Sequence, residues 1–492
     1  MTFKLLPRRT SFAVLLSLSS AFLTACAVGP AYVRPEPAAP AEWSQTVTKA
    51  SRDSSALREW WKSFGDAKLN ELIERAAGSS LELKIAQARV REARALRAVA
   101  AGAELPRLTA GVEFDRTRRS GHNPNLPPGA PTVVNLFQTS FDASWEIDLF
   151  GGTKRAVEAA DAELGASVED LRAAYVTLFG EIARNYVEVR GFQRRLAVAR
   201  RNLEGQKETL AVTRSRLEAG LAPDFDVDRA SAQVSTIEAQ IPPLEVSLQR
   251  AVHRLAVLLG QEPGSLNELL LDEAPIPAPP PELQVGLPSD LLERRPDVRR
   301  AERAVAAATA RVGAATADLY PRFSLAGGFG FQSGRLEDLA LASSRFWSFG
   351  PALRLPLFQG GRIRANIEVQ NERQAQALLA YEKAFLSALE EVENALAAYG
   401  KEEARRRALV EAVAAHERAF ATAGALYSSG LTDFLQVLDA QRSLLAAQSQ
   451  LAESEAAAVS GLVALYKALG GGWEQQAPAA GRPAEVVRSS QE

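Results

Sequence analysis

Four segments of the chain, at 106–116, 136–149, 321–332 and 346–357, alternate apolar and polar side chains with a period of two. This period predicts β-strands with one apolar and one polar face, and an ordinary sandwich would give it too. The segments are about ten residues long, the length that crosses a bilayer when tilted. Aromatic residues lie near their ends, as at a membrane interface. We therefore interpret the segments as strands that face lipid on one side.

Acidic residues gather on the polar side of these strands. They are Glu113, Asp115, Asp142, Glu146 and Asp148. We expect them to line a wet, acidic lumen. Four strands cannot close a barrel, and an open sheet edge is not tolerated in lipid. The chain is therefore expected to oligomerise, and three copies would supply about twelve strands, within the known range for barrels.

Two long Pro-free segments, 155–219 and 362–429, carry apolar residues at helical spacing. Each predicts a helix of about 65 residues, or about 100 Å. Periodicity of this length indicates coiled-coil-like packing. Shorter helices are predicted beside them, at 68–102, 226–259, 296–317 and 433–469. The predicted fold class is therefore mixed: a membrane β-barrel completed by a trimer, joined to a long α-helical coiled-coil barrel.

Three motifs recur in the same order, roughly 210 residues later, which indicates an internal duplication. The runs 103–108, 145–156 and 218–225 are echoed by 317–323, 353–365 and 428–434. We expect a first structural repeat at 68–259 and a second at 296–469. A Pro-rich linker at 260–295 separates them, and the segments 26–67 and 470–492 flank them.

Composition excludes several functional classes. A single Cys excludes a disulfide framework, and three distant His residues give no zinc site. The net charge of −2 argues against a nucleic-acid binder. The glycine-rich run 327–330 lies inside an alternating strand with no lysine after it, so it is not a phosphate loop. We expect no enzyme activity, no metal and no cofactor other than a covalent lipid.

Residues 1–25 are interpreted as a signal peptide. Lys4, Arg8 and Arg9 precede a short apolar core that ends in Leu23-Thr24-Ala25-Cys26. This ending resembles the bacterial lipobox; the alternative is a buried cytosolic Cys26. The resemblance implies a mature chain that begins at acylated Cys26, and Ala27 in place of Asp implies sorting to the outer membrane.

Several runs carry a wider resemblance. They are Trp60-Trp61, 286–298 (GLPSDLLERRPDV), 357–361 (LFQGG) and 437–442 (VLDAQR). Across roughly 31–473, the chain resembles the outer-membrane efflux factor family (TolC/OprM-like), and within it the NodT-type lipoprotein branch. One departure is Gly78-Ser79-Ser80, where the family has an Asn-containing turn; we expect only a local capping change there.

The resemblance implies a homotrimer in outer-membrane lipid, with a twelve-stranded barrel and a helical tunnel through the periplasm. It also implies a mixed equatorial belt formed by parts of 40–66, 260–290 and 470 onward. The tunnel would be closed at its periplasmic end until a periplasmic adaptor protein and an inner-membrane RND-type transporter engage it.

The resemblance also gives roles to residues at the periplasmic tip. By matching motif positions, Asp439 is the constriction aspartate, Leu435 the hydrophobic plug and Arg442 the latch partner. Tyr427 matches a tyrosine that holds the tip helices together. In isolation, Asp439 and Arg442 would be a solvated pair on one helix. Thr432 stands where some members have an Arg that forms an ion-pair latch. The resemblance therefore does not imply that latch in this chain.

The two helical turns at the tip are the expected adaptor-docking sites. Their residues are Gly220, Leu221, Gly430 and Leu431, and the alternative is that each glycine only ends a helix. The function expected is a passive exit duct of a tripartite efflux system, of the kind that gives multidrug resistance. The alternatives are a polypeptide-secretion duct of a type I system and a non-channel lipoprotein scaffold. The acylated N-terminus and the run at 286–292 favour small-molecule efflux.

Overall fold

The computed structural model describes residues 27–44, 55–122, 127, 129–280, 283 and 285–474. The expected signal peptide and Cys26 lie outside these residues. The chain divides into two compact units. Of the described residues, unit 1 takes in those up to Glu36, Val90–Ala166 and Ala301–Tyr381, and unit 2 takes in Pro37–Arg89, Ser167–Arg300 and those from Glu382 onward.

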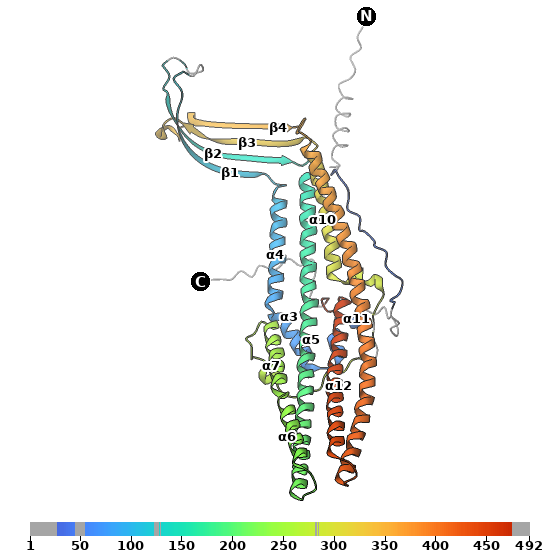
Figure 1. Cartoon of the computed structure of the whole chain (residues 1–492). Helices are drawn as coiled ribbons and strands as arrows, with labels where there is room; N and C mark the ends of the chain where they lie inside the picture. Colours follow the sequence, from blue (N-terminus) through green and yellow to red (C-terminus); the bar gives the residue numbers. More distant parts are fainter. Residues whose placement is uncertain are drawn as a thin grey trace. The chain divides into compact units, whose positions relative to one another are not determined.

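Unit 1 contains one antiparallel sheet of four strands in the order β1-β2-β3-β4 (Figure 1). The strands are β1 (Arg107–Arg118), β2 (Val133–Ile147), β3 (Arg322–Ser333) and β4 (Arg345–Arg354). All four expected strands are present, and each lies beside the next in the chain. The turns between β3 and β4 contain two 3-10 helices, η3 (Leu336–Asp338) and η4 (Ala342–Ser344).

Strand ends differ from the sequence expectation for two reasons. The first hairpin is longer than expected, since backbone pairing continues to Arg118↔Val133 after the alternation of side chains has ceased. The last strand is shorter: β4 stops at Arg354 instead of 357. Its partner β3 begins only at Arg322, opposite Arg354, so the residues after Arg354 have no pairing strand in the described part of the chain.

The long helices are α5 (Gly152–Glu218) and α11 (Arg362–Ser428), each of 67 residues. Shorter helices are α3 (Ala67–Ser79), α4 (Leu81–Gly102), α6 (Asp224–Glu238), α7 (Ile241–Leu258), α10 (Pro296–Ala317) and α12 (Phe434–Ala468). Two expected helices are each split in two. The segment 226–259 breaks between α6 and α7, because Pro242 and Pro243 have no N–H with which to continue the α6 hydrogen bonds.

The other split falls at Ser80, between α3 and α4. Only a local change of helix cap was expected here, but the residues at this break also contact another helix. The Ser79 hydroxyl donates to the carbonyl of Leu259 at 2.6 Å, which ties the end of α3 to the end of α7. A side chain on Gly260 would meet the Ser79 carbonyl at 2.9 Å, so the two helix ends approach as closely as glycine allows.

The helix bounds show the duplication directly. Both α5 and the α6–α7 pair recur 210 residues later, as α11 and as the unbroken α12. The pair α4–β1 recurs later still, because α10 and β3 end 215 residues after α4 and β1 end. Unit 1 thus holds two copies of a helix–strand–strand–helix path.

Unit 2 contains an aromatic core beside several short elements. These elements are α2 (Ser55–Arg58), η1 (Trp60–Phe64), α8 (Asn267–Leu270), η2 (Pro288–Asp290) and α9 (Leu291–Arg294). Trp60 of η1 stacks on Tyr466 of α12 at 5.3 Å between ring centroids, and Trp61 meets Phe179 of α5 edge-on at 5.0 Å. Burial of these rings fixes the short N-terminal elements against the long helices.

Candidate functional site

The register of the sheet sorts its side chains into two faces. Residues directly opposite one another share a face. One row runs Ala110, Phe141, Phe329 and Trp347 across all four strands, and the neighbouring row runs Thr109, Asp142, Gly328 and Ser348. The alternation seen in each strand therefore continues across the sheet as an apolar face and a polar face.

Four of the five expected acids lie on the polar face. Glu113 and Asp115 of β1 share it with Asp142 and Glu146 of β2. The Ser140 hydroxyl donates to Asp142 at 2.7 Å, and the Thr117 hydroxyl donates to Asp115 at 2.7 Å. These carboxylates are exposed in the chain and keep polar neighbours on their own strand.

Asp148 differs from the expectation. It follows the last residue of β2, and its carboxylate accepts a hydrogen bond from the backbone N–H of Lys154 at 2.8 Å. Lys154 lies in the first turn of α5, whose N–H groups have no partner within the helix. Asp148 therefore caps α5, and its charge is favoured there by the helix dipole.

The polar face is also less acidic than expected at the end where the strands meet the helices. Arg107, Arg322 and Arg354 lie on it there. Arg322 pairs with Asp318 at 2.5 Å and lies 3.8 Å from Glu146. A cavity of about 920 Å³ opens at this end of unit 1, with Arg107, Glu146 and Arg322 among its lining residues. Its wall is thus of mixed charge.

Both turns at the tip of unit 2 use the same backbone motif. Gly220 and Gly430 have φ of +71° and +72°, and the N–H of the following leucine bonds back across the helix end. Leu221 donates to Arg216 at 2.7 Å and Leu431 to Leu426 at 2.9 Å, a Schellman ending. The leucine of this motif commonly packs on its own helix, but Leu221 and Leu431 are 68% and 75% exposed.

The expected gate residues fall on one stripe of α12. Leu435, Asp439 and Arg442 are spaced four and three residues apart, so they share a helix face, and all three are exposed. The opposite face of the same turns is buried. The expected pair between Asp439 and Arg442 is not among the ion pairs of the described residues; Arg442 Nε instead donates to Gln233 of α6 at 3.0 Å.

Tyr427 lies in the hydrophobic cluster beneath that stripe. The cluster consists of Leu210, Ala230, Tyr427, Phe434, Val437 and Leu438. The Tyr427 ring is 5.6 Å from that of Phe434. The Arg216 guanidinium of α5 lies 4.5 Å over the ring and donates to the Tyr427 carbonyl at 3.0 Å. Tyr427 therefore joins the ends of α5, α11 and α12.

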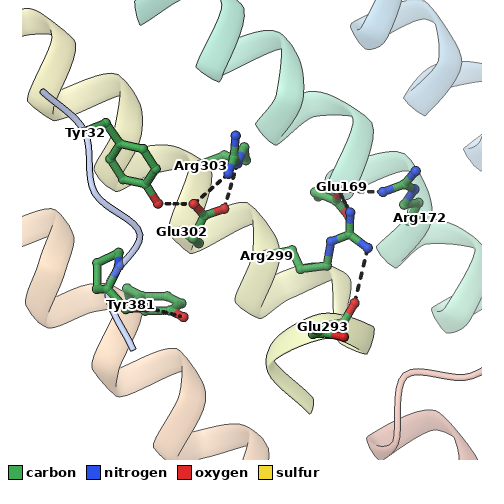
Figure 2. Close-up of polar contacts among 9 residues, drawn as sticks. Tyr32, Glu169, Arg172, Glu293, Arg299, Glu302, Arg303 and Tyr381 are labelled. Carbon is green, nitrogen blue, oxygen red and sulfur yellow. Dashed lines mark hydrogen bonds and ion pairs between the residues drawn. The ribbon is translucent and has the colours of Figure 1, made fainter. Parts of the chain in front are cut away.

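The segment that follows Cys26 is bound to unit 1. Val28 donates its N–H to the Phe150 carbonyl at 3.1 Å, and a side chain on Gly151 would meet Ala27 at 2.7 Å. Further on, the Tyr32 hydroxyl donates to Glu302 of α10 (Figure 2). Burial and this bond raise the pKa of Tyr32 above its ordinary value.

Two buried charged residues of unit 2 were given no functional role from the sequence. Arg295 is 8% exposed and contacts Asp297 and Glu391, each at 2.6 Å. Glu169 accepts from both Arg172 and Arg299, at 2.6 and 2.8 Å (Figure 2). The Arg-Arg-Pro-Asp run was a usable signal for the start of α10, since proline is over-represented at the first helical position.

The described residues hold neither a metal site nor a membrane-spanning helix. No group of three or more His, Cys, Asp or Glu is placed to hold a metal ion. No helix in the described part of the chain is long and apolar enough to cross a membrane.

The chain is similar to known proteins over nearly its whole length. The family model described as outer membrane efflux protein matches residues 72–261 and 287–471. Nodulation protein T of Rhizobium leguminosarum bv. trifolii is 33% identical over 460 residues, covering 94% of this chain and 97% of that protein. The pyoverdine export outer membrane protein OpmQ of Pseudomonas aeruginosa is 34% identical over 465 residues, covering 93% and 97%.

A solved structure agrees in fold. The structure of the outer-membrane channel OprN has a TM-score of 0.83 and 39% identity, covering 91% of this chain and all of that one. In this fold class, four strands from each of three chains make one barrel, and the long helices continue it as a periplasmic coiled-coil tube. The matches in sequence and in structure together show that this chain belongs to the outer membrane efflux protein family.

Proposed function

We propose that three copies of this chain form the outer-membrane exit duct of a tripartite efflux system and conduct small molecules passively. The observation that carries the proposal is the sheet of unit 1. Its apolar face suits lipid, its polar face suits water, and both of its outer edges lack a partner among the described residues. A sheet of this kind is stable in a membrane only when copies close it into a barrel.

The tips of the long helices are the proposed sites for the periplasmic adaptor, which would connect the duct to an inner-membrane RND-type transporter. Leu221 and Leu431 support this role, because each is a large apolar side chain exposed at a helix turn. Scattered exposed leucines need no explanation, but here the same turn occurs twice with the same exposure. A small-molecule cargo is supported by the relative OpmQ, which is described as exporting pyoverdine.

The proposed gate is the exposed stripe Leu435, Asp439 and Arg442. In a trimer each of these residues occurs three times around the axis. Three carboxylates close together attract cations and repel one another, and a ring of leucines hinders water. Tyr427 would hold the tip helices in the closed arrangement through its cluster with Phe434.

The gate can be tested by single-channel recording in planar bilayers. Replacing Asp439 with Asn removes the charge and keeps the shape, so we expect a higher conductance and weaker cation selectivity. Leu435→Ala is the matched control on the same stripe, and it should widen the pore without changing selectivity. Conductance and selectivity equal to wild type in Asp439→Asn would exclude Asp439 from the constriction.

The N-terminal lipid is part of the proposal. Acylation of Cys26 would place its acyl chains in the outer membrane, and the bound segment at Ala27 and Val28 would hold them beside the start of α5. Two acyl signals give a firmer anchor than one. Radiolabelled palmitate should label the wild-type chain and not Cys26→Ser.

The function as a whole is tested by deletion. Loss of the gene should raise the host's sensitivity to toxic small molecules, and the plasmid-borne gene should restore resistance. A purified protein that gives no conductance, together with a deletion that changes no export, would remove the duct as the function.

A further inference from the structure

The two outer strands of the sheet each present an edge that no other described strand of this chain pairs with. These are β1 and β4. Large apolar side chains on both strands are strongly exposed, among them Val112 at 86%, Trp347 at 78% and Leu353 at 62%. In lipid such edges must be paired. The trimer of the proposed function supplies the partner, but it leaves open which residues lie opposite one another.

The internal repeat supplies a measure of that register. Adding 215 to a residue of β1 gives its equivalent in β3, and adding 210 to a residue of β2 gives its equivalent in β4. The pair Leu108↔Ala143 then becomes Phe323↔Leu353, which is a pair in the sheet. Arg107↔Ser144 likewise becomes Arg322↔Arg354, and Phe114↔Phe137 becomes Phe329↔Trp347. The two hairpins therefore have the same register over every pair of the second hairpin, from Arg322↔Arg354 to Phe331↔Arg345.

The pairing of β2 with β3 is then the template for the junction between copies. In a closed ring, the neighbour that follows β4 is β1 of the next copy, just as β3 follows β2. Shifting Ala143↔Gly327 by the same offsets, we propose that Leu353 lies opposite Val112 of the partner subunit. The proposal rests on the trimeric duct and adds to it a residue-by-residue register.

The proposed register keeps like faces together. Leu353 and Val112 both belong to the apolar face, and Ala352 meets Glu113 of the partner subunit on the polar face. A shift of one residue would exchange the faces of an entire strand, so this agreement is required of any true register. The template itself was chosen without reference to polarity, because it uses only the positions of the repeat.

The same register accounts for two charges on the apolar face. Arg116 and Arg118 of β1 carry that parity. Shifting Thr139↔Phe331 and Phe137↔Ser333 places the partner's Arg116 opposite Phe349 and the partner's Arg118 opposite Trp347. A guanidinium next to an aromatic ring is a favourable cation–π neighbour. Two arginines at the end of a lipid-facing strand would thus lie beside exposed rings of the next copy.

The register also explains where β4 ends. Within the part of the chain that the structure describes, β4 pairs only with β3 and stops at Arg354. In β2, pairing with β1 likewise stops at Ser144, and pairing with β3 carries the strand on to Ile147. By the same offsets, the partner's Leu108 would pair with Leu357 and extend β4 by three residues. The alternation of side chains up to 357 had predicted a strand of that length.

Disulfide trapping tests the register in the intact protein. Cys26 is the single cysteine of the chain, so the background is low. The double variant Leu353→Cys with Val112→Cys is expressed in outer membranes, oxidised with copper–phenanthroline and separated on a non-reducing gel. Directly opposite residues have Cα atoms about 4.5–5.5 Å apart, within reach of a disulfide. We expect a ladder of covalent dimer and trimer.

The matched control shifts the pair by two residues and keeps the same face. In Leu353→Cys with Ala110→Cys the separation is about 7–8 Å, beyond disulfide reach. We expect at least about tenfold less cross-linked product. Leu108→Cys with Ala143→Cys is the intrachain control and should be oxidised within one chain, so that it migrates as a monomer.

The outcomes separate the register from the function. Stronger cross-linking of the shifted pair, in a protein that still purifies as a conducting trimer, would overturn the register and leave the duct intact. Absence of any oligomer or conductance in the unoxidised wild type would overturn both. Cross-linking of Leu353→Cys with Val112→Cys in intact membranes, together with its loss after detergent has dissociated the protein into monomers, supports both the register and the duct.

Discussion

Replacing Arg295 with alanine should loosen the point at which α10 begins and α12 ends. The Arg295 guanidinium makes four hydrogen bonds. It donates Nε and Nη2 to the two oxygens of Asp297, at 3.0 and 2.6 Å, and Nη1 to Glu391 at 2.6 Å. Nη1 also donates to the carbonyl of Ala468 at 2.8 Å, in the last turn of α12.

The expected cost can be worked from these contacts. The carboxylates of Asp297 and Glu391 are 49% and 58% exposed, so water replaces the lost cation and each pair contributes about 0.2–1 kcal/mol. The Ala468 carbonyl is buried and would lose a partner, at about 1–3 kcal/mol. The methylene groups of Arg295 pack closely against Gly470, where an added Cβ would lie 3.0 Å from Arg295 Cγ. Their loss adds about 0.8 kcal/mol per buried methylene. Alanine carries no charge whose burial costs free energy, and this offsets part of the loss. We therefore expect a net loss of about 3 kcal/mol in local stability.

Hydrogen–deuterium exchange measures this loss locally, which suits a trimer whose global unfolding is not two-state. A loss of about 3 kcal/mol corresponds to roughly 100-fold faster exchange of the amides in the last turn of α12. Arg300→Ala is the control: Arg300 lies in the first turns of α10, close to Arg295 in the chain, and forms one exposed ion pair with Asp170, at 2.8 Å. Equal exchange in the two variants would refute the view that burial makes Arg295 a structural anchor.

Two further predictions concern the turn at Gly430 and the buried side chain of Tyr186. Gly430→Ala should destabilise the tip by about 1 kcal/mol because its φ of +72° disfavours a Cβ, whereas Gly424→Ala in α11 should stabilise the same helix by about 0.5–1 kcal/mol. Both sites have open space around the new methyl, so equal signs in tip hydrogen exchange would contradict the backbone argument. Burial, and then the hydrogen bond to Asp66, raise the pKa of Tyr186. The neutral phenol therefore stabilises the fold fully below the unfolded-state pKa of about 10, and this stabilisation is lost as the pH rises above that value. Tyr186→Phe should cost about 1 kcal/mol at neutral pH and flatten the alkaline decline in thermal stability; an unchanged decline would assign it to other groups.

The sequence by itself determined the elements of this protein and their repetition. Strand alternation and long Pro-free periodicity are local patterns, so they predicted the four strands and both 67-residue helices to within a few residues. The break between α6 and α7 was also local, since Pro242 and Pro243 mark it, and it was missed because apolar periodicity continues across them. The duplication could be recognised in the sequence because both copies keep glycines at the same turns.

Only the tertiary structure decided which charges are buried and what each one contacts. Asp148 carries the parity of the polar face, yet it caps α5, because the chain turns away from the sheet one residue earlier. Arginine is ordinarily an exposed residue, and Arg295 becomes an anchor only because the end of α12 and the middle of α11 surround it. The contacts of Arg295 with Glu391 and Ala468 join residues 96 and 173 positions apart. Neither hydrophobic periodicity nor spacing carries information about them, because both describe one element at a time.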